Sequence, residues 1–429
     1  MDRRDFIKKS ALGTAAIASP FYIRSSDKNH KLKVGLIGAG WYGMVISKAA
    51  LRVGGLEIVA VCDVDSKHLQ ESAEELESLQ GKRPKTFKYY QDMIDMKGLE
   101  AVFIATPPQW HALQFIAACE KGLDIFCEKP LSYEPMEGLA MVKAAEKAGN
   151  IVQVGFQRRQ SKAFQHAGQF IRDGKAGNIH QIVAQIHYRA NPGDTTIQDP
   201  PASLDWDEWC GPAPKLDYRP SIAHRNWRLE REYGNGHLAD WGIHHIDIIR
   251  KIMDEGIPSE YRSTGGTYAL KGQITTPDTL TANMAFDKAP LVWQHRMWGT
   301  GDLNPEFNNG IFFHGNKATI FVSDSRFVVM PPGRDAERTD LNIPTEGGMQ
   351  DLHMAEFIEA SKQKDPKKIS CTVQDGFASS TTVQLAMISY YTNSLVKWDN
   401  QNRTIIDNPG AEAMLKRKYR ESWQHPMQG

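Results

Sequence analysis

The sequence is poor in cysteine, balanced in charge and free of long apolar runs, and each of these features narrows the possible functions. Its five cysteines are odd in number and form no CxxC pair, so neither a disulfide framework nor a zinc ribbon is predicted. Lys and Arg together number 51, as do Asp and Glu, so no net field directs the chain to nucleic acid or to an anionic membrane. Nothing after the N-terminal segment approaches the about 18 uninterrupted apolar residues of a membrane span. We therefore expect a globular protein that acts on a small molecule, with five buried cysteines: Cys62, Cys119, Cys127, Cys210 and Cys371.

The N-terminal residues have the order of an export signal. Residues 2–9 read DRRDFIKK, and a short, weakly apolar stretch with the small-residue pattern AIA follows. The paired arginines with Phe6 and Lys8 resemble the twin-arginine signal, although a basic amphipathic tail would share these charges. We predict that residues 1–30 are a signal peptide and linker and that the folded chain is exported to the periplasm, with no membrane insertion after signal removal. Export in the folded state suggests, by analogy, a cofactor bound beforehand.

A glycine-rich turn joins an apolar strand to a helix near the start of the predicted folded region. The chain there reads KVGLIGAGWYGMVISKAAL, in which Gly38, Gly40 and Gly43 form GxGxxG. A second apolar strand, 56–62, ends just before Asp63. Gly38 permits the tight turn, Gly40 the approach of a pyrophosphate and Gly43 the packing of helix on strand, while the helix N-terminus attracts the phosphates. This context predicts a dinucleotide-binding site.

The residue after the second strand bears on which dinucleotide binds. A carboxylate at Asp63 accepts hydrogen bonds from ribose hydroxyls and repels a 2′-phosphate, which favours NAD over NADP. Ser66 and Lys67 follow closely and offer groups that would hold a 2′-phosphate instead. We predict NAD and keep NADP as the less favoured alternative.

Strands and helices alternate as far as Gly155, the pattern of a doubly wound parallel sheet in an α/β fold. Ligands of such sheets bind outside the carboxyl ends of the strands, where three unusual segments occur, 106–108, 127–130 and 156–159. We predict a nucleotide-binding domain at 31–155. Its six strands are predicted from residue 33 and at 56–62, 86–87, 99–105, 123–127 and 151–155, and its later helices at 66–79, near Met93, at 111–120 and at 135–148. The expected cofactor contacts are Gly38, Gly40, Trp41, Tyr42, Gly43, Asp63, Thr106, Pro107, His111, Glu128, Lys129 and Gln157.

Four motifs in this order resemble the Gfo/Idh/MocA family of sugar and inositol oxidoreductases. They are GLIGAGWYG, the ATPP turn before His111, the EKP triplet at 128–130 and DWGIHHID at 240–247. The likeness runs from about Lys33 to nearly the C-terminus, and the segments around 390–398 and 419–423 resemble a periplasmic subgroup. The resemblance implies a Rossmann domain followed by an α+β domain, here 156–429, with a large, mainly antiparallel sheet whose open face meets the nicotinamide.

The resemblance also implies that Lys129, Asp240 and His244 carry the catalysis, and the residues themselves point the same way. Lys129 follows an apolar strand beside Pro130, where an ammonium group would polarise an oxygen near the nicotinamide; a solvent-facing turn is the alternative. Asp240, His244 and Asp247 share one face of a predicted helix. An Asp one turn before a His orients the imidazole and raises its basicity, as a general base requires.

Two other histidines stand beside this predicted helix face. We expect His245 to pack or to make a structural hydrogen bond. A metal site formed by His237, Asp240 and His244 is conceivable by ligand type, but nothing in the sequence fixes its geometry and the resembled family needs no metal. We therefore predict no metal site.

Beyond Gly155 the sequence alternates in the manner of an antiparallel sheet. A long loop, 191–228, is rich in aromatic residues and is predicted to cover the substrate site, with Trp206 and Trp209 either anchoring it by burial or stacking on a sugar. Strands are predicted at 182–188, 282–286, 291–297 and 318–322, and helices that pack back on the sheet or the first domain at 352–362 and 375–396. The expected substrate contacts are Lys129, Arg158, Tyr188, Trp227, Arg228 and His244.

The leading hypothesis is hydride transfer between NAD and a secondary hydroxyl of a sugar or glycoside, with C3 as a candidate carbon. His244 would accept the hydroxyl proton, Asp240 would orient His244, and Lys129 would stabilise the oxygen. The periplasm offers no ready pool of NAD, so we expect the cofactor to be retained. Retention leaves open a redox-neutral glycosidase, lyase or epimerase acting through a transient 3-keto intermediate, and a non-catalytic sugar sensor is a further alternative. No nucleic-acid partner is predicted, and a homo-oligomer stays open.

Overall fold

The computed structural model describes residues 30–299, 305–420 and 422–427. The predicted twin-arginine motif and cleavage pattern lie outside the described residues, so export remains a prediction.

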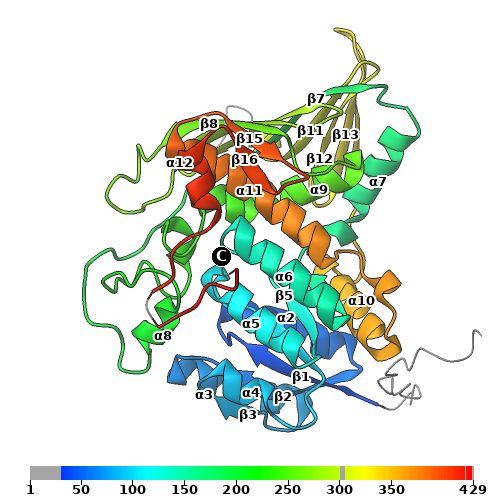
Figure 1. Ribbon diagram of the computed structural model, residues 1–429. Coiled ribbons are helices and arrows are strands. Elements are labelled where there is room, and N and C mark those ends of the chain that lie inside the picture. Colours follow the sequence, from blue (N-terminus) through cyan, green and yellow to red (C-terminus); the bar gives the residue numbers. More distant parts are fainter. Residues whose placement is uncertain (1–29, 300–304, 421, 428–429) are drawn as a thin grey trace, which may run out of the picture. The chain divides into compact units, whose positions relative to one another are not determined.

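The first half of the described chain contains one parallel sheet (Figure 1). Its strands are β1 (Leu32–Ile37), β2 (Leu56–Cys62), β3 (Lys85–Phe87), β4 (Ala101–Ile104), β5 (Asp124–Cys127) and β6 (Val152–Val154). They lie in the order β3-β2-β1-β4-β5-β6, and each neighbouring pair is parallel. The chain starts near the centre, runs to one edge and returns to build the other, which confirms the predicted doubly wound sheet. β4, β5 and β6 are wholly buried, as both-face coverage requires.

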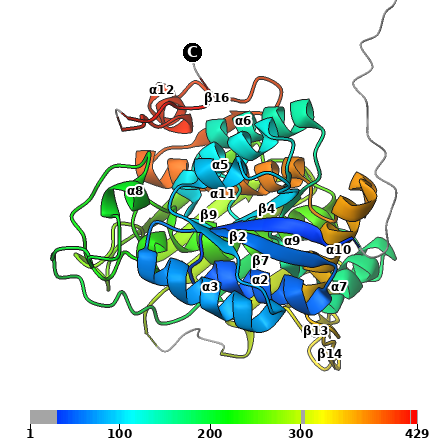
Figure 2. The same cartoon turned by 90° about the horizontal axis from the view of Figure 1, so that it is seen from below.

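Helices cover both faces of this sheet. They are α2 (Trp41–Val53), α3 (Ser66–Gln80), α4 (Tyr90–Ile94), α5 (Pro108–Glu120) and α6 (Pro135–Ala148). Figure 2 shows α2 and α3 on one side of the strands and α5 and α6 on the other. Asp65 caps α3 by accepting from the backbone N–H groups of Lys67 and His68, and Gly81 ends the helix in the left-handed conformation.

The second half forms a ten-stranded sheet in the order β14-β13-β12-β11-β7-β10-β9-β8-β15-β16. The strands are β7 (Ile179–His187), β8 (Glu260–Gly266), β9 (Thr279–Ala285), β10 (Pro290–Arg296), β11 (Asn309–Gly315), β12 (Thr319–Val322), β13 (Arg326–Met330), β14 (Thr339–Asn342), β15 (Val396–Asp399) and β16 (Thr404–Ile406). Among the described pairs β7 and β10 are parallel and the others antiparallel, so the predicted mainly antiparallel sheet is confirmed.

Helices α7, α9 and α11 lie on one face of the large sheet, between it and the parallel sheet (Figure 1). The helical elements of this half are η1 (Gln157–Gln160), α7 (Lys162–Arg172), α8 (Trp206–Cys210), η2 (Asn226–Leu229), η3 (Leu238–Gly242), α9 (Ile243–Met253), η4 (Pro305–Phe307), α10 (Met349–Gln363), η5 (Pro366–Lys368), α11 (Val373–Thr392), α12 (Pro409–Glu412) and η6 (Ala413–Leu415). The predicted helix 375–396 is too long at its C-terminal end, because Asn393 takes the left-handed conformation and stops α11.

The C-terminal helices complete the core of the nucleotide-binding half, as predicted. Met354, Phe357 and Ile358 of α10 belong to the same buried cluster as Val34 of β1 and Ile58 of β2. α11 packs against α6 in the same manner. The parallel sheet therefore depends on residues from the far end of the chain, and the predicted domain boundary at residue 155 marks a change of sheet rather than of core.

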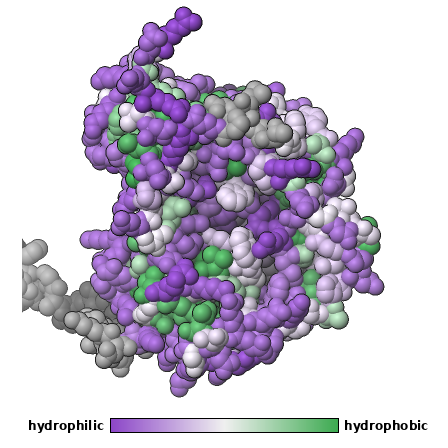
Figure 3. All heavy atoms as spheres, turned by 180° about the vertical axis from the view of Figure 1, so that it is seen from behind, coloured by the Kyte–Doolittle hydropathy of each residue, from purple (hydrophilic) through white to green (hydrophobic). Residues whose placement is uncertain are grey.

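One face of the molecule can be followed by its hydropathy. Figure 3 shows a face that is hydrophilic over most of its area, with apolar side chains gathered in separate patches. None of the described helices is both long and apolar enough to cross a membrane. All five cysteines are free and buried, as predicted.

Candidate active site

The glycine loop between β1 and α2 has the geometry that a pyrophosphate group needs. Gly38 has a φ of +89°, and a Cβ there would lie 2.8 Å from the backbone of Ala105 and Thr106. A Cβ on Gly43 would lie 2.0 Å from the carbonyl oxygen of Gly38, so only glycine permits this approach of helix to strand. At Gly40 a Cβ would meet no described atom within 4 Å, and α2 begins with neither a side-chain cap nor an acidic residue. Its first N–H groups are therefore available to an anion.

This loop lines a cavity of about 610 Å³, the nucleotide cavity. Asp63 lies in its wall at the end of β2. Its Oδ2 accepts a hydrogen bond from Ala39 N at 2.7 Å, and its Oδ1 accepts one from Asp65 N at 2.9 Å. Burial raises the pKa of Asp63, while the two backbone N–H groups oppose the shift. The carboxyl group thus anchors the glycine loop and faces the cavity at once.

Other expected cofactor residues reach the cavities from neighbouring loops. Trp41, Thr106 and Pro107 line the nucleotide cavity. Gln157 Nε2 donates a hydrogen bond of 2.8 Å to the Tyr42 hydroxyl, which fixes η1 to the start of α2.

His111 is a correction to the expected cofactor contacts. Its ring is buried and lines neither this cavity nor the one described next. The ring nitrogens lie 2.7 Å from the carbonyl oxygen of Thr106 and 2.9 Å from that of Pro130. His111 therefore connects the loop at Thr106 to the loop at Pro130 and fixes their relative position.

A second cavity of about 460 Å³, the polar cavity, adjoins the first. Seven residues line both: Trp41, Tyr42, Ala105, Thr106, Arg225, Trp227 and Arg228. From the second half of the chain, η3 and α9 supply Asp240, Trp241 and His244, and Tyr188 follows directly on β7. None of its described lining residues lies within a strand of the ten-stranded sheet. The sheet face that we expected to meet the nicotinamide thus does not line this cavity, whereas η3 and α9 do.

An ion-pair network dominates the polar cavity. Lys129 Nζ donates to Asp240 Oδ1 at 2.9 Å and to the Asp240 carbonyl oxygen at 2.5 Å, and Arg228 Nε donates to the same Oδ1 at 3.0 Å. Burial alone would raise the pKa of Asp240, but the charges of Lys129 and Arg228 outweigh it and hold the pKa below its ordinary value. An ionised Asp240 therefore fixes the position of the Lys129 ammonium group.

The predicted pairing of Asp240 with His244 is a second correction. No hydrogen bond between them occurs in the described part of the chain; the carboxylate turns to Lys129 instead. The physical reason is local: η3 is a π-helical turn, in which positions four apart no longer stack as they do in an α-helix.

His244 lines the polar cavity as an imidazole without a partner. Its Nδ1 is buried and meets no hydrogen-bonding group among the described residues. Burial, followed by the positive charges of Lys129 and Arg158, holds the pKa of His244 well below its usual value. The ring is therefore neutral at pH 7, which leaves one ring nitrogen free to accept a hydrogen bond from a hydroxyl group.

Two further residues of α9 serve the structure. Asp247, predicted on the same face as His244, accepts hydrogen bonds of 2.7 and 2.6 Å from Nε and Nη2 of the buried Arg159. His245 Nε2 lies 3.0 Å from Asn309 Oδ1, the structural hydrogen bond expected of it.

His237 lies in the polar cavity beside Tyr188, with ring centroids 4.8 Å apart. The set of His237, Asp240 and His244 is not among the groups of described residues whose ligand atoms all lie within 4.8 Å of one another. The alternative metal site considered from the sequence therefore lacks the required geometry.

The remaining expected substrate residues line the polar cavity as well. Arg158 Nε lies 3.0 Å from Asp324 Oδ1 in an ion pair, and the Arg158 guanidinium lies 5.6 Å from the Trp241 ring. Arg228 lies over Trp227 at 4.4 Å. Two arginines thus lie against tryptophan rings in the cavity wall.

The loop 191–228 packs in an aromatic cluster that also includes Tyr233, just beyond the loop. Trp206 and Trp209 stack with centroids 4.7 Å apart, and Tyr218 and Tyr233 pack edge-on against Trp206. Both tryptophans are buried. Of the two alternatives, anchoring by burial is the one observed, although Trp209 also reaches the nucleotide cavity.

Two cavity residues were missed by sequence reasoning. The Arg225 guanidinium lies 4.8 Å over the Trp41 ring, and Asp324 pairs with Arg158. Neither stands in a recognisable motif, and both reach their partners only through tertiary structure. A third property, the protonation of Glu128, was also missed: burial raises its pKa to about 8.

Comparison with known proteins decides the family. A model described as the NAD-binding Rossmann fold of an oxidoreductase family matches residues 32–156, and one described as its C-terminal alpha/beta domain matches residues 202–397. The chain belongs to the Gfo/Idh/MocA family. This is an oxidoreductase family whose first domain is an NAD-binding Rossmann fold.

Several curated proteins are similar to this chain. The 2,7-anhydro-N-acetylneuraminate hydratase of Mediterraneibacter gnavus is 28% identical over 67% of this chain and 66% of its own length. The inositol 2-dehydrogenase of Salmonella typhimurium is 31% identical over 37% of this chain and 47% of its own length. The rhizopine catabolism protein MocA of Rhizobium meliloti is 25% identical over 83% of this chain and 94% of its own length. The chain thus spans about half to two thirds of the first two.

Solved structures of related fold include a levoglucosan dehydrogenase in complex with NADH and levoglucosan. It has a TM-score of 0.66 and 20% identity over 86% of this chain and 99% of that one. An aldose–aldose oxidoreductase of Caulobacter crescentus has a TM-score of 0.67 and 16% identity over 86% of this chain and 100% of that one. At this identity the likeness establishes the fold.

Proposed function

We propose that this protein transfers a hydride between a retained NAD and a secondary hydroxyl group of a sugar or glycoside, with C3 as the reacting carbon. The observation that carries the proposal is the continuity of the two cavities. The nucleotide cavity holds the glycine loop and Asp63, the polar cavity holds Lys129 and His244, and seven residues line both. A hydroxyl-bearing carbon in the polar cavity would therefore lie beside a dinucleotide in the other.

The residues present fit NAD. The space beside Gly40, the uncapped start of α2 and the carboxyl group of Asp63 suit a pyrophosphate followed by a ribose without a 2′-phosphate. When bound, NAD supplies the acceptor for the hydride that leaves the carbinol carbon.

The chain's own residues divide the remaining work. The neutral imidazole of His244 accepts the proton of the substrate hydroxyl. The Lys129 ammonium donates a hydrogen bond to the same oxygen and stabilises the negative charge that develops there. Asp240 positions Lys129, in place of the role with His244 expected from the sequence. Arg228 and Arg158 offer donors to the other sugar hydroxyls.

A redox-neutral outcome is the second candidate, and one comparison favours it. The similar protein of Mediterraneibacter gnavus is named a hydratase, and hydration involves no net oxidation. In this chain oxidation at C3 would acidify the C2 proton, and loss of that proton would expel the aglycone from C1 as an alcohol and leave a C1–C2 double bond. Return of the hydride to C3 would then give an unsaturated sugar, or the free sugar if water adds across the double bond first. We also propose that the folded protein reaches the periplasm with its cofactor, because a retained NAD is the form that functions there.

Variants of the two proposed catalytic residues test this function. Lys129→Ala and His244→Ala are each expected to lower kcat by about 100-fold or more, since each acts on the reacting oxygen. NAD affinity, measured by fluorescence titration, should stay near that of the unmodified protein. His180→Ala, an exposed site outside both cavities, is the matched control. Near-normal turnover of a glycoside panel by either catalytic variant would remove that residue from the mechanism.

A further inference from the structure

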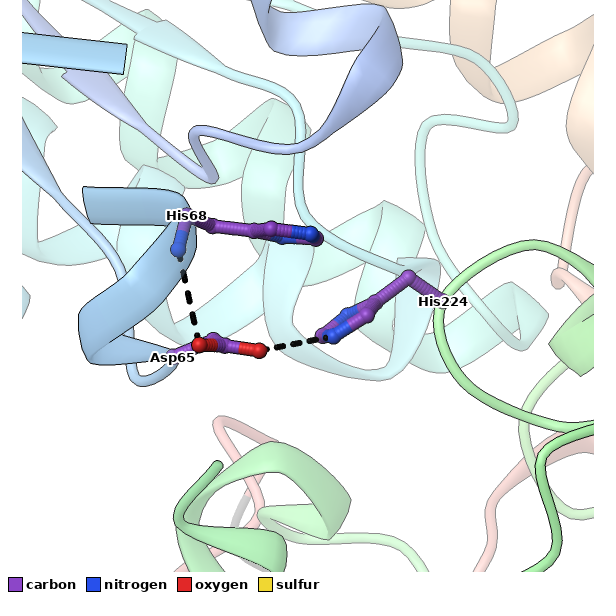
Figure 4. Close-up of side chains that lie close together, drawn as sticks. All are labelled: Asp65, His68 and His224. Carbon is purple, nitrogen blue, oxygen red and sulfur yellow. Dashed lines mark hydrogen bonds and ion pairs between the residues drawn. The ribbon is translucent and has the colours of Figure 1, made fainter. Parts of the chain in front are cut away.

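Two histidines and an aspartate from distant parts of the chain converge beside the nucleotide cavity (Figure 4). Asp65 and His68 belong to the start of α3, and His224 belongs to the loop 191–228. One ligand atom from each of the three lies within 4.8 Å of the others. Both histidines also line the nucleotide cavity.

The contacts within this group leave ligand positions available. Asp65 Oδ1 caps α3 by accepting from Lys67 N at 2.9 Å, while Oδ2 lies 3.0 Å from His224 Nε2. Figure 4 shows the His68 ring above this pair, and its centroid lies 4.1 Å from that of His224. The buried Nδ1 of His68 has no hydrogen-bond partner in the described ranges.

The donor set specifies a class of ligand. Two imidazoles and one carboxylate match the three-ligand sites of Zn²⁺ and of borderline divalent ions such as Co²⁺, with a fourth position left for water. Asp63, whose Oδ1 accepts from Asp65 N, adds a second carboxyl group nearby. A divalent cation would give His68 Nδ1 a partner, and the negative charges of Asp63 and Asp65 would favour its binding.

We propose that Asp65, His68 and His224 bind one divalent transition-metal ion, which fastens the loop 191–228 to the nucleotide-binding half. The ion joins two elements 156 residues apart in the sequence, from His68 to His224. Because the same loop ends in Trp227 and Arg228, which line both cavities, the ion restrains the segment that closes over the nucleotide. This last consequence, slower release of NAD, rests on the proposed function; metal binding itself does not.

A second group, Glu134, Glu137 and His425, has comparable spacing and serves as the internal control. Two of its carboxylate oxygens already accept from protein donors: Glu137 Oε1 accepts from the Tyr419 hydroxyl at 2.6 Å, and Glu134 Oε1 accepts from Glu137 N at 2.7 Å. His425 Nε2 lies 2.9 Å from Glu134 Oε1.

Metal titration of the full chain tests the site. Protein freed of metal by chelation is titrated with Zn²⁺ by calorimetry and with Co²⁺ by its visible d–d absorption, without substrate. We expect one equivalent to bind, with a tetrahedral Co²⁺ spectrum. His68→Ala and His224→Ala should each weaken binding by more than the roughly 10–100-fold that loss of a supporting residue costs. Asp65→Asn, which keeps an oxygen for capping α3, should weaken it as well.

His425→Ala should bind the metal as the unmodified chain does. Absence of stoichiometric binding, unchanged binding by the His68 and His224 variants, or loss of binding on replacing His425 would each overturn the site. For the fastening role, the rate of NAD release is measured with and without Zn²⁺. Zinc should slow release from the unmodified chain and leave His224→Ala unaffected; equal rates with and without zinc in the unmodified chain would overturn the role.

Discussion

Asp63 shows how one carboxyl group can serve structure and specificity together. Its two oxygens accept from Ala39 N in the glycine loop and from Asp65 N at the start of the next helix. The group that would meet the ribose is therefore held in place by the loop that would meet the pyrophosphate. Cofactor choice and loop geometry are coupled at this residue.

Replacement of Asp63 by Ala should weaken NAD binding and relax the preference for NAD over NADP. Hydrogen bonds to a charged group contribute about 1.5–3 kcal/mol, so the loss of NAD affinity should be about 10- to 100-fold. NADP affinity should change less, because the repulsion of its 2′-phosphate is lost at the same time. Dissociation constants for both dinucleotides check this expectation. An unchanged NAD-to-NADP ratio would show that another residue sets the choice.

At the scale of elements, the buried pair of Arg159 and Asp247 ties η1 to α9. Their side chains are 3% and 1% exposed, and Ser379 of α11 donates to the same carboxylate at 2.8 Å. The elements η1, α9 and α11 thus meet at one ion pair.

Asp247→Ala should destabilise the protein by about 3–5 kcal/mol, because it leaves a buried guanidinium without its main counter-charge. The free energy of urea unfolding measures the loss. Asp351→Ala, which breaks the exposed pair with Arg52, is the matched control and should cost at most about 1 kcal/mol. Similar losses in both variants would contradict the argument from burial.

Glu134, at the start of α6, gives the molecule a pH dependence. Burial raises its pKa to about 8. An unfolded glutamate titrates near pH 4.3. A folded-state pKa above the unfolded one means that this group's contribution to stability is full below about pH 4.3 and is lost as the pH rises toward 8. At neutral pH its contact with His425 therefore involves a protonated carboxyl group.

Glu134→Gln removes this titration and keeps an oxygen to accept from Glu137 N. The stability of the variant relative to the unmodified protein should rise by about 1 kcal/mol per pH unit between pH 5 and pH 8. Urea unfolding at several pH values measures the difference. Glu120→Gln, at an exposed position, should show no such trend. A constant difference for Glu134→Gln would mean that the carboxyl group is ionised in the fold.

Elements with a clear local residue pattern could be predicted from the sequence, whereas features that depend on tertiary contacts could not. The parallel sheet followed from apolar strands that end in glycine, proline or acidic residues. In the large sheet, β14 is wholly exposed and β11 contains Gly310 and Gly315, so neither shows the apolar alternation of a strand. For the site, Lys129 and His244 stood in motifs. The pairing of Asp240 with Lys129 could not be predicted, because it depends on a π-helical turn that has no recognisable residue pattern.

For the whole molecule, retention of NAD has a measurable consequence. Turnover of a suitable glycoside or sugar pair should exceed the amount of enzyme with no NAD added, and NADH should appear at less than one equivalent. Mass analysis of the nucleotide released on denaturation identifies the cofactor. Substrate deuterated at C3 should show a primary isotope effect. Multiple turnovers that require added NAD and yield stoichiometric NADH would identify an ordinary dehydrogenase instead.

Because α10 contributes to the core of the parallel sheet, its position in the chain decides when that core can be completed during synthesis. Met354 follows Val154, the end of the parallel sheet, by 200 residues. At roughly 5–20 residues per second, a ribosome needs about 10–40 s to add that length. During this interval the nascent nucleotide-binding half lacks part of its core and exposes apolar strands to chaperones. The core of this half can therefore be completed only after Ile358 has been synthesised.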